Sequence, residues 1–217
     1  MSLPYYIGRK LVRLISRLVF RVQITGIENI PMSGGFILAC NHISYCDPPL
    51  VGSWVSREMY FLAKKELMDY WGFGALLRSL NALPLKRDAI DRRAIELGVE
   101  KIREGYGLVI FPEGTRSKAD DLLPGRAGVG VIAKEAECPI VPTYVFGTNR
   151  LSRCLAGAKR LRISYGRPIP VDWIVLQPHD KSGYQAITEE VMARIRRLRE
   201  AVQGGALSTE TSAHPSD

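Results

Sequence analysis

The sequence predicts an α/β protein with a single domain, in which helices cover a largely parallel sheet and a separate amphipathic helix begins the chain. Short apolar segments bounded by turn residues alternate with longer segments that carry apolar residues at helical spacing. The 217 residues are enough to bury one substantial core. Apolar residues make up 46% and charged residues 24%, which excludes disorder, collagen and coiled coil for most of the chain.

Residues 1–21 predict a basic amphipathic helix. They include five Lys and Arg residues and no acid, and these charges interrupt the apolar pattern too often for a membrane span or a signal peptide. The apolar side chains share one face at helical spacing: Ile7, Leu11, Leu14, Ile15 and Leu18. This pattern is typical of a helix lying in a membrane interface, and it also fits a surface helix that packs its apolar face on its own domain.

The domain itself is predicted over residues 22–203. We expect strands over residues 20–25, 35–40, 60–63, 107–111, 140–146 and 161–165, where apolar runs follow turn signals. Helices are expected from Pro48 and over 88–104, 129–137 and 188–202, the last with its inner face formed by Val191, Ile195, Leu198 and Val202. After Gly204 and Gly205 the chain is small and polar, so residues 204–217 are predicted to be a disordered tail.

The net charge of +8 favours partners that carry phosphate: nucleic acid, an anionic lipid surface or a phosphorylated small molecule. A second basic block lies within residues 138–171 and holds six Lys and Arg residues without an acid. Nucleic acid is the least favoured of the three, because the basic residues are not interleaved with aromatic residues on a recognisable module. The four cysteines lack C-x-x-C spacing, which argues against a metal site and a disulfide framework and fits a reducing compartment.

The first loop whose residues suit catalysis follows the strand at 35–40 and includes His42 and Asp47. Because Pro48 favours the first helical position, Asp47 is predicted to act as an N-cap whose carboxylate folds back toward His42. An Asp bonded to one imidazole nitrogen fixes the tautomer and leaves the other nitrogen as a general base. The alternative is a polar helix start in which Asp47 merely caps His42.

No protein nucleophile accompanies this pair. The chain has no G-x-S-x-G elbow, and Cys46 is too close in sequence to align easily with His42. A His–Asp pair without a nucleophile can activate a hydroxyl that the substrate supplies, so that transfer is direct. It can also activate water, which leaves a hydrolase as an alternative.

The second loop, Phe111-Pro112-Glu113-Gly114-Thr115-Arg116-Ser117, also follows an apolar strand. Gly114 permits a close backbone approach or a positive φ. Thr115 and Arg116 offer a hydroxyl and a planar set of donors that suit a phosphate, and Glu113 could order Arg116 or bond a glycerol hydroxyl. A tight turn with a surface Glu–Arg pair is the alternative.

Four blocks, in order, resemble the glycerophospholipid acyltransferase family. Asn41-His42-x-Ser44-x-x-Asp47 is similar to the family's H-x4-D block, and residues 111–117 are similar to its F-P-E-G-T-R-S block. Residues 63–67 together with 83–87 resemble the second motif, and residues 140–143 resemble the fourth. One departure is Asn81, which stands where many members have Gly.

The resemblance implies an acyl transfer in phospholipid biosynthesis. His42 would take the proton from the sn-2 hydroxyl of 1-acylglycerol 3-phosphate, Asp47 would orient His42, and the hydroxyl oxygen would attack the thioester of acyl-CoA or acyl carrier protein. The product would be phosphatidic acid. Glycerol 3-phosphate, another lysophospholipid or a lyso-amino-lipid are alternative acceptors within the family, and a non-catalytic phospholipid binder is an alternative outside it.

The resemblance also implies the substrate contacts and the setting. Glu113, Gly114, Thr115 and Arg116 would hold the glycerol phosphate, Lys64 and Arg87 would add positive charge, and Ser44 would line the pocket. No metal or bound cofactor is expected, and the acyl donor is a co-substrate. The expected partners are an anionic membrane surface, the lysophospholipid acceptor and the acyl donor, with acyl carrier protein as one form of that donor. The expected location is the cytoplasmic face of a membrane, as a peripheral or monotopic protein.

Overall fold

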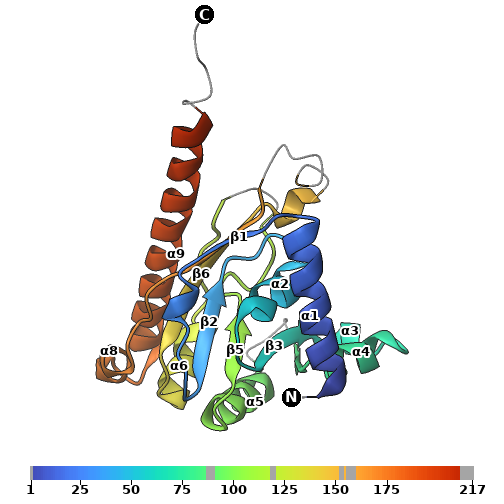
Figure 1. Ribbon diagram of the computed structural model, residues 1–217. Coiled ribbons are helices and arrows are strands. Elements are labelled where there is room, and N and C mark those ends of the chain that lie inside the picture. Colours follow the sequence, from blue (N-terminus) through green and yellow to red (C-terminus); the bar gives the residue numbers. More distant parts are fainter. Residues whose placement is uncertain (1, 87–90, 118–120, 152–153, 155–159, 211–217) are drawn as a thin grey trace, which may run out of the picture.

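A computed structural model describes residues 2–86, 91–117, 121–151, 154 and 160–210 (Figure 1). Its sheet has seven strands, in the spatial order β1-β7-β6-β2-β5-β3-β4. The strands are β1 (Gln23–Thr25), β2 (Phe36–Cys40), β3 (Met59–Lys64), β4 (Ala82–Leu85), β5 (Gly107–Ile110), β6 (Ile140–Phe146) and β7 (Arg162–Tyr165). Neighbours are parallel except β6 and β7. The predicted α/β fold with a largely parallel sheet is therefore confirmed.

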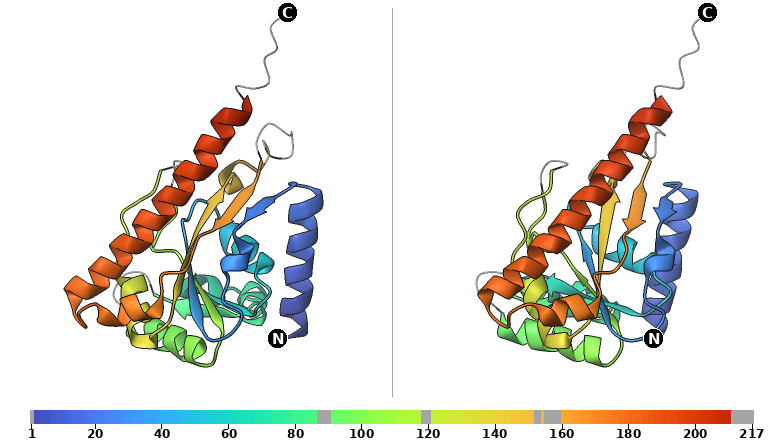
Figure 2. Two further views of the ribbon diagram at one scale, coloured as in Figure 1. Left: turned by 60° about the vertical axis from the view of Figure 1, so that its left-hand side comes forward. Right: turned by 90° about the vertical axis from the view of Figure 1, so that its left-hand side faces the viewer.

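Helices cover both faces of this sheet (Figure 2). They are α1 (Leu3–Leu18), α2 (Asp47–Trp54), α3 (Lys65–Met68), α4 (Phe73–Ser79), α5 (Arg92–Arg103), α6 (Gly128–Ala136), α8 (Val171–Leu176) and α9 (Lys181–Glu210), with 3-10 turns at Ile27–Asn29 and Thr148–Arg150. Within the part of the chain that the structure describes, none of these helices combines the length and apolar character needed to cross a bilayer.

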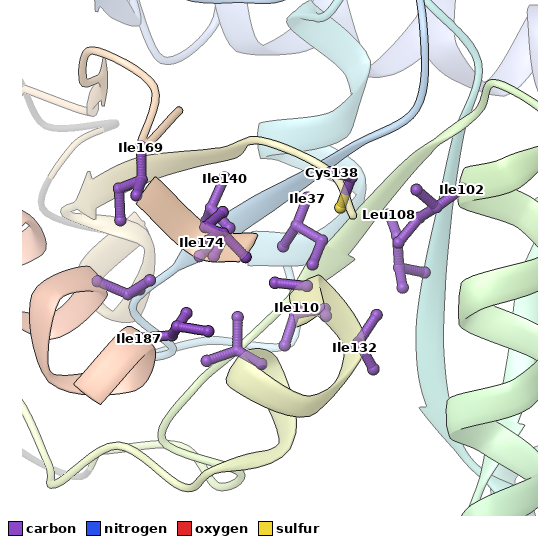
Figure 3. Close-up of a cluster of buried hydrophobic side chains, with 14 of the residues drawn as sticks. Ile37, Ile102, Leu108, Ile110, Ile132, Cys138, Ile140, Ile169, Ile174 and Ile187 are labelled. Carbon is purple, nitrogen blue, oxygen red and sulfur yellow. The ribbon is translucent and has the colours of Figure 1, made fainter. Parts of the chain in front are cut away.

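Strand β2 shows how the sequence divides the core into two layers. Ile37 and Ala39 point to the side covered by α5, α6 and α9, whereas Phe36, Leu38 and Cys40 point to the side covered by α2. All five side chains are fully buried, as a central parallel strand requires. Figure 3 shows the first layer, where isoleucines from strands and helices meet.

Several short elements were not predicted. Strand β4 has four residues and contains Pro84, and the sheet accepts this proline because β4 lies at its edge. Asn81, just before β4, has a φ of 65°, a left-handed conformation that Asn adopts more readily than most residues. The Gly-to-Asn departure noted in the sequence is therefore compatible with the turn.

Helix boundaries also differ from the predictions. Asp91 caps α5 by accepting a hydrogen bond from the Ala94 backbone, so this helix begins later than residue 88; residues 87–90 lie outside the described part. Helix α9 begins at Lys181 rather than 188 and continues to Glu210. The helix therefore continues past Gly204 and Gly205, where we expected the tail to begin, since extending an existing helix costs less than starting one. Residues 211–217 lie outside the described part.

Helix α1 packs with its polar and small residues inward. Tyr5 and Ser16 are buried, and the Tyr5 hydroxyl accepts a hydrogen bond from the Met59 backbone at 2.9 Å. The apolar face predicted from the sequence points away from the domain, with Leu11 53% and Leu14 54% exposed. The alternative in which this face packs on its own domain is therefore wrong.

Two arginines of α1 bind the domain instead of solvent. Arg13 lies beside the end of α2 and donates hydrogen bonds to the backbone carbonyls of Ser53, Trp54 and Val55. Arg9 donates to the carbonyl of Ser56 at 3.0 Å. Arg13 thus satisfies carbonyl groups that the end of a helix leaves unpaired, and it fixes α1 against α2.

Candidate active site

The side chains of His42 and Asp47 meet at the end of the central strand β2. The distance from His42 Nδ1 to Asp47 Oδ2 is 2.9 Å, and both residues are buried. Helix α2 begins at Asp47 and its N-cap is Cys46, so the predicted N-cap, Asp47, is one residue too late. The carboxylate nevertheless folds back toward His42, because its Oδ2 also accepts hydrogen bonds from the backbone amides of Ile43 and Ser44 at 2.7 Å.

A residue that sequence reasoning missed holds the other oxygen of Asp47. The Thr148 hydroxyl donates to Asp47 Oδ1 at 2.5 Å, and both side chains are almost completely excluded from solvent. Thr148 follows β6, whose neighbour in the sheet is β2. A hydroxyl residue directly after a parallel strand, at the same sheet edge as His42, was the signal available in the sequence.

Glu113 ties the second loop to the first. Its Oε1 accepts a hydrogen bond from the His42 backbone at 3.1 Å, and its Oε2 accepts one from the Leu123 backbone at 3.0 Å. Burial of this carboxyl raises the pKa of Glu113 above its ordinary value, in spite of these two bonds. The Ser117 backbone adds a further link by donating to the His42 carbonyl at 2.8 Å.

The imidazole of His42 lies between the two loops. It stacks on the Phe111 ring with centroids 4.1 Å apart, so one ring face is covered by the second loop while Nδ1 contacts the first. Nε2 is the ring nitrogen that does not contact Asp47, and His42 lines a cavity. Cys46, by contrast, is exposed at the start of α2.

Arg116 does not pair with Glu113, contrary to one expectation from the sequence. Both residues are described, and Glu113 bonds to backbone amides while the Arg116 guanidinium lies 3.5 Å from the centre of the Tyr45 ring. Thr115 and Arg116 are exposed. The cation–π contact holds the exposed Arg116 beside the first loop.

A cavity of about 430 Å³ adjoins His42. Its walls are mainly apolar, contributed by β3, β4, β5, α5 and α6, and its polar lining includes Lys86, Asp91 and Arg126. Gly114 also lines it with a φ of 67°, and a Cβ at this position would lie 2.8 Å from Arg126 Cδ. A side chain at residue 114 would therefore be strained and would displace Arg126.

Two further predicted site residues, Ser44 and Lys64, are not among the residues that line this cavity. The Ser44 hydroxyl accepts a hydrogen bond from the Cys46 backbone at 3.2 Å and supports the turn before α2. Lys64 ends β3, is 43% exposed, and lies 3.6 Å from a carboxylate oxygen of Glu66. Arg87 lies outside the described residues. Among the residues that the structure describes, no cluster of three His, Cys, Asp or Glu side chains is placed to hold a metal ion.

Comparison with known proteins agrees with this arrangement. The chain is 28% identical over 178 residues to the 1-acyl-sn-glycerol-3-phosphate acyltransferase of Bacillus subtilis, covering 82% of this chain and 87% of the relative. It is 30% identical over 137 residues to the lyso-ornithine lipid O-acyltransferase of Pseudomonas aeruginosa, covering 62% and 51% of the two chains.

A solved structure extends the similarity to the fold. The crystal structure of the 1-acyl-sn-glycerophosphate (LPA) acyltransferase from Thermotoga maritima superposes with a TM-score of 0.67 at 25% identity, covering 96% of this chain and 81% of that one. The sequence model of the Acyltransferase family matches residues 21–146, which include both loops and more than half of the chain. The chain therefore belongs to the acyltransferase family.

Proposed function

We propose that this acyltransferase moves an acyl chain from acyl-CoA or acyl carrier protein to the sn-2 hydroxyl of 1-acylglycerol 3-phosphate. The product is phosphatidic acid. The observation that carries the proposal is the buried His42–Asp47 pair, 2.9 Å apart, beside a largely apolar cavity and an exposed arginine. The relatives from Bacillus subtilis and Thermotoga maritima support the choice of acceptor.

In the proposed mechanism, Asp47 accepts a hydrogen bond from the Nδ1–H of His42, which fixes the tautomer that carries its lone pair on Nε2. Nε2 removes the proton from the acceptor hydroxyl as its oxygen bonds to the thioester carbonyl carbon. The tetrahedral intermediate then expels the thiolate, which takes the proton from the imidazolium. An ester and a free thiol result, and no covalent enzyme intermediate forms.

The acceptor phosphate is proposed to bind Arg116, Thr115 and the Gly114 backbone, with charge from Lys64 and Arg87. Arg116 is already held beside the first loop by Tyr45, so its guanidinium loses little side-chain freedom on binding. We assign Glu113 a positioning role, because its oxygens bind the His42 and Leu123 backbones. Ser44 supports the turn that carries Asp47.

The lipid acceptor is proposed to reach the site from a membrane to which the protein binds peripherally. The exposed apolar face of α1 would enter the bilayer interface, and the exposed basic residues Lys10, Arg17 and Arg21 would contact anionic head groups. The cytoplasmic face of the membrane remains our proposed location.

The test is an acceptor screen with purified protein and labelled acyl-CoA, repeated with acyl carrier protein as the donor. We expect ester formation with 1-acylglycerol 3-phosphate and its loss in His42→Ala. Faster transfer to a lyso-ornithine lipid would instead support the acceptor named for the Pseudomonas relative. Release of free fatty acid without an ester product would indicate a hydrolase and refute the proposal.

Arg116→Ala separates these acceptors. Removing a binding charge is expected to raise the KM for the phosphorylated acceptor about tenfold or more, with a smaller effect on kcat. A phosphate-free acceptor should lose little. Equal losses with both acceptors would contradict the phosphate-binding role of Arg116.

A further inference from the structure

A second exposed apolar surface lies on the connection between β3 and β4. We call it the aromatic tip: Tyr70, Trp71, Phe73 and Leu76, at the start of α4 and just before it. Trp71 is completely exposed, and Tyr70 and Leu76 are at least half exposed. Four large apolar side chains so close together on the surface form a patch that calls for a partner.

Helix α4, which begins at the aromatic tip, contacts α1 at its other end. The Ser2 hydroxyl donates to the Ser79 carbonyl at 3.3 Å, and a Cβ at Gly8 would lie 3.0 Å from Leu80 Cδ2. Figure 1 places α1, α3 and α4 together at its right-hand edge, and Figure 2 shows this side facing away from α9. The exposed leucines of α1 and the aromatic tip therefore belong to one side of the molecule.

We infer that the aromatic tip is a second membrane-binding element, which inserts Trp71 and Phe73 into an anionic bilayer alongside α1. The inference rests on the proposed function only in that a lipid acceptor must be taken from a bilayer. Trp and Tyr flanked by Phe and Leu are the residue types that settle at a membrane interface, where an aromatic ring is apolar at one end and polar at the other.

Charge favours an anionic bilayer over a second copy of the chain. Residues 1–27 and 70–87 contain no Asp or Glu, and their basic residues include Lys10, Arg17, Arg21, Arg78 and Lys86. The exposed acids Glu66 and Asp69 lie just before the tip and are outnumbered by these basic residues. Two copies meeting through this side would bring like charges together, whereas anionic head groups attract them.

The aromatic tip also connects directly to the cavity. It lies on the connection that leaves β3 and enters β4, and Leu62 of β3 and Leu85 of β4 both line the cavity beside His42. Insertion of the tip would therefore hold the cavity-forming strands against the lipid layer from which the acceptor comes.

Vesicle co-sedimentation tests the inference with the full chain and vesicles of equal parts phosphatidylcholine and phosphatidylglycerol. Trp71→Asp is expected to lower the partition coefficient about tenfold or more, since it removes a large apolar side chain and adds a charge. The matched control is Leu176→Asp in α8, which changes an 80% exposed leucine on the opposite side and should bind like the wild type. Equal binding by wild type and Trp71→Asp would overturn the inference.

A second measurement does not depend on a destabilising charge. Brominated lipids should quench part of the tryptophan emission of the wild type, and Trp71→Phe should lose that part while Trp54 and Trp173 keep their own. Unchanged quenching in Trp71→Phe would contradict insertion. Insertion would also be contradicted if the wild type were a dimer and Trp71→Asp made it a monomer without changing its binding to vesicles. Vesicle binding needs no turnover, so binding through Trp71 without acyl transfer would refute the proposed function and leave this inference standing.

Discussion

Replacing Asp47 by Asn tests the central interaction of the site with little change of shape. Asp47 Oδ2 accepts hydrogen bonds from His42 Nδ1 and from the Ile43 and Ser44 amides, and Oδ1 accepts one from Thr148. An Asn oxygen can keep the backbone bonds, and the Thr148 hydroxyl can rotate to accept from the Asn amide. The variant is therefore expected to fold.

The loss should be in the chemical step. A unit charge about 4 Å from the developing imidazolium, at an effective dielectric constant of about 20, contributes about 4 kcal/mol. Without that charge on Asp47, kcat should fall by roughly a thousandfold. The KM for the acceptor should change little, because Asp47 is fully buried and does not line the cavity.

Single-turnover transfer from labelled acyl-CoA measures this loss without interference from product release. Thr148→Val is the graded control: it removes one hydrogen bond from Asp47 but keeps the charge, so we expect a loss of about tenfold. A folded Asp47→Asn variant that retains more than a tenth of the wild-type rate would refute the assigned role of Asp47.

Three further predictions concern stability and membrane binding. Arg13→Ala should lower the free energy of unfolding by about 2 kcal/mol, since it uncaps α2, whereas Arg17→Ala on the exposed side should change it by under about 0.5 kcal/mol; urea titration compares them. Burial raises the pKa of Glu113, so the folded chain holds this proton more tightly than the unfolded chain. The unfolding free energy of the wild type relative to Glu113→Gln should therefore fall as the pH rises above the ordinary value of 4.5, and a rise would contradict this assignment. Leu11→Asp should weaken vesicle binding about tenfold, and wild-type binding should weaken as salt is added; salt-independent binding would argue against anionic head groups as the partner.

The sequence predicts the central strands well because their physical signal is strong. Strands β2 and β5 are continuous apolar runs bounded by turn residues, as strands buried on both faces must be, and β6 is mainly apolar although it contains Pro142 and Thr143. Strand β4 has no such signal: it lies at the edge, has four residues, and includes Pro84. Its pairing with β3 depends on tertiary contacts that a local pattern does not contain.

The same distinction applies within the site. The pairing of His42 with Asp47 was predicted correctly, because Pro48 indicated that a helix begins beside Asp47. A carboxylate at the start of that helix can fold back toward His42, whereas on one continuous helix the two side chains could not meet. The partners of Glu113 and Thr148 lie far along the chain: Thr148 is 101 residues from Asp47, and Glu113 is 71 residues from His42. A motif indicates that a carboxylate is needed at residue 113. It does not indicate that the carboxylate satisfies buried backbone amides, since those amides become unpaired only once the two loops are folded.

Helix α1 illustrates how a correct pattern can leave a structural choice open. Its apolar stripe is real, but the inward face includes Tyr5, Val12 and Ser16. Its docking also depends on the capping of α2 by Arg13. Helix α2 has eight residues, so about 12 Å separates the carbonyls that Arg13 binds from Asp47 at the other end. The helix proposed to lie in the membrane and the carboxylate proposed to orient His42 are thus fixed to the same short, rigid element. A displacement of α1 that breaks the Arg13 bonds should be transmitted to Asp47 through α2, so Arg13→Ala should reduce kcat as well as stability. Arg13→Lys should restore stability only in part, because a single ammonium cannot copy the planar arrangement of donors.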